Sequence, residues 1–134
     1  MSVELEGLDQ LMKTLEGLSG EEAAEATMMD GLTKAGNMIQ ETAKSNCPVD
    51  TGQLRNSIEV SKTEHAVLVG TNVEYAPYVE YGTGRRGDPT VAHRHDWEGM
   101  YPQPFLYPAL NTHIPTIKTK VEESLQNAIR KAGG

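Results

Sequence analysis

Apolar residues recur every three or four positions near both ends of the chain, which is the spacing of amphipathic helices. In the N-terminal part, Val3 and Leu5 alternate with glutamates before leucines take over at helical spacing. The pattern predicts a brief extended lead and then a helix near residues 8–17. The leucines of this helix are Leu8, Leu11, Leu15 and Leu18.

A second helix is predicted directly after the first. Ser19 and Glu22 have the spacing of a capping box, in which a hydroxyl and a carboxylate satisfy the free N–H groups at a helix start. Apolar residues continue at helical spacing until Pro48, which cannot continue a helix. We therefore expect a helix from this box to about Asn46.

The same spacing returns from Pro104 to the C-terminus and predicts a long C-terminal helix. Two prolines, Pro108 and Pro115, fall inside the pattern. Because proline lacks an N–H and clashes with the preceding turn, we expect the helix to be interrupted or kinked near both.

The middle of the chain has a period of two. Apolar residues at 58, 60, 67 and 69 alternate with polar ones and predict a β-hairpin whose first strand begins at Ser57.

The segment from Tyr75 to Tyr81 then suits a short helical turn that Gly82 ends in a left-handed conformation. Residues 83–102 are rich in glycine, proline and charge and predict a long loop, which in a small domain is usually functional or mobile.

The length and composition of the chain predict that residues 1–134 form one domain. The chain has no apolar run of about 18 residues and no signal-peptide pattern, so we expect a soluble, intracellular protein. Cys47 is the single cysteine, which fits a reducing compartment. An alternative role for Cys47 as a nucleophile beside His65 has no orienting acid assigned to it.

Charge and aromatic residues are unevenly placed. The net charge is −7, and residues 1–50 carry ten Asp and Glu against three Lys. Such an acidic surface repels phosphate backbones and disfavours generic nucleic-acid binding. All aromatic residues except histidine lie between Tyr75 and Tyr107, so this segment should supply much of the core or an interface.

The triplet Asp50-Thr51-Gly52 matches the catalytic sequence of aspartic proteases. That chemistry needs two carboxylates sharing a proton, which a homodimer could supply. A long helix and a proline precede the triplet, however, where the protease needs a loop between strands. We favour a capped turn in which Asp50 accepts backbone N–H groups and Gly52 permits the bend.

The predicted loop contains the chain's one locally basic patch. Its candidate partner-contact residues are Arg85, Arg86, His93, Arg94, His95 and Trp97. The patch could meet an acidic surface or a phosphate, although a solvated loop is more common. His93, His95 and Asp96 could also reach one metal ion, but a third ligand at a supporting spacing is missing, and we assign no metal site and no cofactor.

Three stretches in order resemble one known family. "PVDTGQLRNSI", "VGTNVEYAPYVEYGTG" and "PQPFLYPAL" resemble the gene-product-ten-like family of lambdoid tailed phages, which are minor tail or head-tail connection proteins. The chain departs from that family in a longer segment between Arg85 and Met100. The shared motif residues are Pro48, Asp50, Thr51, Gly52, Leu54 and Arg55, then Tyr75, Ala76, Tyr78, Glu80, Tyr81 and Gly82, and finally Pro104, Phe105 and Pro108.

The resemblance implies an α+β fold, with N-terminal helices and a long C-terminal helix packed on a small, mostly antiparallel sheet. It also implies a non-enzymatic virion protein that forms a ring at the head-tail junction and contacts neighbouring neck and tail proteins. Such a protein assembles in the bacterial cytoplasm, and DNA can pass through its channel without specific binding. For Arg55 and Glu80 we expect a charge-assisted hydrogen bond between the first two motifs.

Two other classes of function stay open from the residues. One is a small dimeric acid protease that acts through Asp50. The other is a regulatory binding module that uses the basic loop at residues 85–95.

Overall fold

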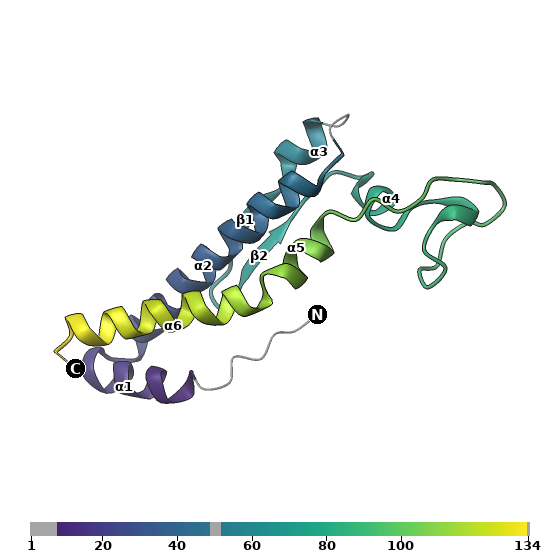
Figure 1. The fold of residues 1–134 in the computed structure, drawn as a ribbon. Coiled ribbons are helices and arrows are strands. Elements are labelled where there is room, and N and C mark those ends of the chain that lie inside the picture. The colour runs from purple at the N-terminus through teal and green to yellow at the C-terminus, as the bar shows by residue number, and fades with distance from the viewer. Residues whose placement is uncertain (1–7, 49–51, 134) are drawn as a thin grey trace. The chain divides into compact units, whose positions relative to one another are not determined.

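The computed structural model describes residues 8–48 and 52–133 (Figure 1). Helices dominate, and a two-stranded antiparallel sheet lies in the middle of the chain, which confirms the α+β class. The elements are α1 (Asp9–Ser19), α2 (Glu21–Asn46), α3 (Gly52–Ser57), β1 (Glu59–Lys62), β2 (Val67–Gly70), α4 (Ala76–Tyr81), the 3₁₀ helix η1 (Gly84–Arg86), α5 (Leu106–Thr112) and α6 (Ile114–Lys131).

The contacts divide the chain into two compact units. Unit 1 comprises the chain up to Met38, the segment Val60–Leu68, and the chain from His113 onward. Unit 2 comprises Ile39–Glu59 and Val69–Thr112. Helix α2 and both strands contribute residues to both units, and the extent of a single domain over residues 1–134 stays a prediction.

The core of unit 1 forms where α1 lies against α6. Its buried side chains are Leu8, Leu15, Ala24, Val121 and Leu125. Gly31 of α2 belongs to the same unit, and a Cβ at this position would lie 2.7 Å from the Cα of Val121. The missing side chain therefore lets the backbone of α2 approach that of α6 closely.

The two N-terminal helices are confirmed, but the capping box between them is wrong. Ser19 is the last residue of α1, and Gly20 follows with a left-handed φ of 90°. Only glycine adopts that conformation without strain, so Gly20 rather than Ser19 marks the junction. Glu21 and Glu22 fill the first turn of α2, where a negative charge interacts favourably with the helix dipole.

The hairpin is also confirmed, with Thr63 N–H donating to the carbonyl of Ala66 over 2.8 Å in its turn. Its first strand begins at Glu59 and not at Ser57, because residues 52–57 form the short helix α3. Leu54 and Ile58 are both buried and four positions apart, so a helical turn places both side chains on one side. The prediction of a connecting turn at this position is therefore corrected to a helix.

Two amide side chains of α2, a partly buried one and an exposed one, bond to the backbone of other segments of unit 2. Gln40 Nε2 donates to the carbonyl of Ile58 over 2.8 Å, and Asn46 Nδ2 donates to that of Phe105 over 3.3 Å. The buried apolar residues of this unit are Ile39, Ala43, Cys47, Leu54, Ile58, Ala76, Phe105 and Ala109.

The predicted interruption of the C-terminal helix is confirmed, since α5 and α6 are separated at His113. Pro108 and Pro115 both lie in the first turn of their helices, where the missing N–H has no intrahelical partner to lose. The prolines therefore stand at helix starts instead of bending one long helix. Of the helices that the structure describes, none combines the length and apolar character needed to cross a bilayer.

Candidate functional site

The first motif lies between α2 and β1. Asp50 and Thr51 lie outside the described residues, so the predicted cap by Asp50 stays a prediction. Gly52 begins α3, Leu54 is fully buried, and Arg55 is exposed. Helix α2 ends at Asn46 before the triplet, and Gly52, the third residue of the triplet, begins α3, whereas strands flank an aspartic-protease carboxylate.

The second motif forms α4 and divides its side chains between core and solvent. Ala76 and Glu80 are buried, whereas Tyr78 and Tyr81 are 62% and 41% exposed. The segment was expected to supply the core or an interface, and a place in the core is wrong for these two tyrosines. Gly82 ends the helix with φ 76°, which confirms the left-handed stop.

Glu80 connects the second motif to the third. It is only 8% exposed, and its Oε1 accepts a hydrogen bond from Leu106 N–H at 2.8 Å and from Phe105 N–H at 3.4 Å. These N–H groups lie at the start of α5, where no intrahelical acceptor exists. Among the ion pairs of the described residues, none joins Arg55 to Glu80, so backbone N–H groups replace the expected guanidinium.

The third motif supplies the largest buried side chain of unit 2. Phe105 is 1% exposed, Pro108 lies in the first turn of α5, and Pro104 is exposed. Because Glu80 bonds to the backbone at Phe105, the ring of Phe105 is held in the core by a contact from α4. Periodicity could not indicate this pairing; the one available signal was an acidic residue within the otherwise apolar and aromatic stretch "YVEY".

Residues 83–102 form a folded loop that leaves α4 and returns to α5 (Figure 1). Thr83 and Met100 exchange backbone hydrogen bonds of 2.9 and 3.1 Å, and Arg85 N–H donates to Trp97 O over 2.8 Å. Glycines sit where the two sides of the loop meet, and a Cβ on Gly99 would collide with the carbonyl of Thr83. The loop is therefore closed at its base by direct backbone contact.

The charges of this loop are largely neutralised within it. It holds three arginines and three carboxylates. Arg94 Nη2 lies 2.7 Å from Asp96, and Arg86 Nη2 lies 3.5 Å from Glu98. The interpretation of this segment as a basic patch is weakened, because two of its arginines already face carboxylates.

His93 has both ring nitrogens directed at backbone carbonyls. Nδ1 lies 2.6 Å from Val91 O, and Nε2 lies 2.7 Å from Gly84 O. These contacts, and to a smaller degree the charge of Asp88, raise the pKa of His93 above its ordinary value. A metal ion would have to displace one of these carbonyls, and the described residues contain no group of three His, Cys, Asp or Glu that could hold one.

Cys47 is buried, and this burial raises the pKa of its thiol, with Arg55 acting in the opposite direction and Glu80 in the same one. A thiol whose pKa is raised carries little thiolate at neutral pH and is a weak nucleophile. His65 lies at the exposed tip of the hairpin, 4.0 Å from Glu64. The geometry around Cys47 therefore suits a packed core thiol.

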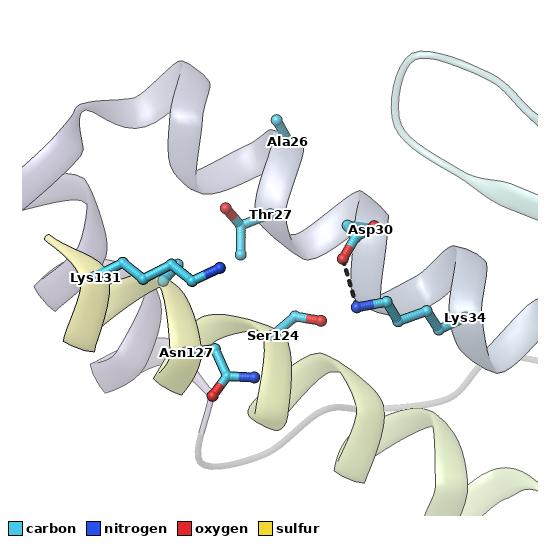
Figure 2. A pocket seen from close by; sticks show the side chains of 8 residues that line it. Ala26, Thr27, Asp30, Lys34, Ser124, Asn127 and Lys131 are labelled. Carbon is cyan, nitrogen blue, oxygen red and sulfur yellow. Dashed lines mark ion pairs between the residues drawn. The ribbon is translucent and has the colours of Figure 1, made fainter.

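Unit 1 contains a shallow groove of about 340 Å³ along α2 and α6 (Figure 2). Thr27, Asp30 and Lys34 line it from α2, and the last two form an ion pair of 3.0 Å. Ser124 and Asn127 line it from α6. The lining of the groove contains one carboxylate, Asp30, which is paired with Lys34, so it lacks the two acidic groups of an acid–base site.

Comparison of the sequence with known protein families identifies a match. The family model described as "Bacteriophage HK97-gp10, putative tail-component" matches residues 9–82, from the start of α1 to the end of the second motif. The loop and the third motif follow the matched residues, so their place in the family stays a prediction. No curated protein and no solved structure matches the chain. Because the match covers more than half of the sequence, the chain belongs to the HK97-gp10-like family of bacteriophage tail components.

Proposed function

We propose that this tail component is a structural subunit of the head-tail junction, where copies of it form a ring and contact neck and tail proteins. The observation that carries the proposal is a set of large apolar side chains exposed on unit 2, between residues 78 and 107. They are Tyr78, Tyr81, Trp97, Met100, Tyr101 and Tyr107.

These exposed aromatic residues support the presence of a protein–protein interface on unit 2. Tyr, Trp and Met are enriched at protein contacts because they bury large area, and Tyr and Trp also keep a polar tip for hydrogen bonds. Tyr101 is 69% exposed and lies 5.3 Å below the guanidinium of Arg86, so one of these rings is already ordered by a cation–π contact. An ordered ring loses less side-chain entropy on binding than a free one.

A ring requires two different patches on each subunit, because closure by rotation joins unlike surfaces. We propose that the exposed aromatic side chains of unit 2 belong to one of these patches. We infer that the acidic exposed face of α2, which carries Glu21, Glu22 and Glu25, lines the channel and repels the phosphates of the passing genome. A reconstruction of the neck with α2 on its outer wall would contradict this placement.

The proposed role is non-enzymatic, with function residing in contacts. The protease alternative rests on Asp50, which helices flank on both sides. The binding-module alternative rests on the arginines of the loop, two of which face carboxylates within it. Neither alternative gains an observation in its favour.

Complementation of a phage that lacks this gene tests the proposal. We expect the double change Trp97→Ser and Tyr101→Ser to leave heads and tails that do not join, counted by electron microscopy, while circular dichroism shows unchanged helix content. Leu68→Ser is the matched control, since Leu68 is 53% exposed but lies on the hairpin. Full infectivity of the double variant would refute the assignment of this surface.

A further inference from the structure

We propose that His93 is a proton-operated latch, in which the protonated imidazole holds the 83–102 loop closed between Val91 and Gly84 and loss of the proton releases it. This inference is independent of the proposed head-tail role. It concerns a segment that lies beyond the residues matched by the family model.

The first support is the geometry of the ring. A neutral imidazole carries one N–H and one lone pair, whereas an imidazolium carries two N–H groups. In this loop both nitrogens face carbonyl oxygens, at 2.6 Å to Val91 O and 2.7 Å to Gly84 O. Only the protonated ring can donate to both, so a neutral ring would place a lone pair against an oxygen.

The second support is the packing around the ring. A Cβ on Gly87 would lie 2.7 Å from Nε2 of His93, so only a residue without a side chain fits beside this edge of the ring. Gly84, which provides one of the carbonyls, has φ 59° and would place a Cβ 2.6 Å from the carbonyl of Trp97. The absence of side chains at Gly84 and Gly87 therefore lets the loop close tightly around the Nε2 side of the imidazole.

The charged groups near the ring come from two segments. Asp88 attracts the imidazolium, and hydrogen bonds from Thr90 lower the pKa of Asp88, so it stays ionised as the histidine titrates. His95 has its ring centroid 4.1 Å from that of His93. Arg85 and the ion-paired Arg86 lie on η1, which carries the Gly84 carbonyl.

The direction of the effect follows from these contacts. The two carbonyl contacts and Asp88 raise the pKa of His93 in the closed loop above the ordinary value of 6.5. Both hydrogen bonds of the protonated ring are therefore fully present below pH 6.5. They are lost as the pH rises through the raised pKa of His93. Acidification holds the segment around His93 against the carbonyl of Gly84, and mild alkalinity releases that segment, while the Thr83–Met100 contacts keep the base of the loop closed.

Nuclear magnetic resonance of the ¹⁵N-labelled full chain tests the proton directly. We expect the His93 imidazole, assigned by its loss in His93→Gln, to titrate at a higher pH in the native chain than in the same chain in urea. A native midpoint equal to or below the urea midpoint would overturn the proposal.

Fluorescence of Trp97, the single tryptophan, reports on the loop. We expect acrylamide quenching of the native chain to step up through the His93 midpoint. That step should be lost in His93→Gln and in Gly87→Ala, whose methyl displaces the ring, and kept in His95→Gln, the matched control. Helix content by circular dichroism should be the same in all four proteins. A step that persists in His93→Gln would refute the latch.

Discussion

The Oε1 atom of Glu80 accepts a hydrogen bond from the N–H of Leu106 over 2.8 Å, across 26 positions of sequence. The carboxylate lies at the start of α5 and serves as its cap from another helix. A negative charge at that end also interacts favourably with the helix dipole. The "YVEYGT" and "PFLYP" stretches are therefore parts of one structural unit.

Glu80→Ala should lower the free energy of unfolding by about 1–3 kcal/mol, because two backbone N–H groups near the core lose their acceptor. Glu80→Gln keeps an acceptor oxygen and should lose less. Urea unfolding followed by circular dichroism measures both. Glu74→Ala, at an exposed position just before α4, is the control, and a native urea midpoint in the Glu80→Ala variant would contradict the capping role.

Two glycines in helices make a matched pair with opposite outcomes. Gly31→Ala should destabilise the protein by about 1–3 kcal/mol, because the new methyl would lie 2.7 Å from the Cα of Val121. Gly17→Ala meets nothing within 4 Å and should stabilise α1 by roughly 0.5–1 kcal/mol. Thermal unfolding of both variants measures the difference. Equal shifts in the same direction would mean that α2 and α6 do not approach closely at Gly31.

Most of the regular elements were predictable from periodicity, and the errors have physical causes. The capping rule selected Ser19, but a left-handed Gly20 decides where α1 ends. Helix α3 was missed because it is only 6 residues long, and its one buried residue, Leu54, lies an even number of positions from Ile58 and Val60 of the predicted strand.

The contacts of the candidate site were not predictable from the sequence, and the role of its motif residues stays a prediction. A charge-based argument paired Glu80 with Arg55, but burial favoured N–H groups that lie 25 and 26 positions away in sequence. The carbonyl partners of His93 depend on how the loop folds back on itself. The spacing of residues along the sequence does not indicate that fold. The positions of Asp50 and Thr51 lie outside the described residues.

The stability of the protein should respond to the thiol of Cys47 at alkaline pH. Burial raises the pKa of Cys47 above its ordinary value of 9.0, so its stabilising contribution is present below pH 9.0 and is lost as the pH rises through the folded-state pKa. The difference in urea midpoint between the native chain and Cys47→Ala should therefore shrink as the pH rises above 9.0. A difference that stays constant over this range would mean that the thiol titrates as it does in the unfolded chain.

The loop arginines should not confer binding to DNA. The chain has a net charge of −7, and Arg86 and Arg94 already face carboxylates of the loop. We expect the native chain and the triple change of Arg85, Arg86 and Arg94 to alanine to pass through a DNA column alike at moderate salt. If the column retained the native chain but not the triple variant, that result would support the binding-module alternative.

The outer part of the 83–102 loop is a suitable site for attaching a label, because the base of the loop is closed. Backbone contacts between Thr83 and Met100 separate the exposed Ala92 from α4 and α5, and the single native thiol, Cys47, is buried. Ala92→Cys therefore supplies one accessible thiol in a chain whose other thiol is shielded. A gold cluster or fluorophore attached there would mark each copy of the protein in an intact virion while leaving α4 and α5 unaltered.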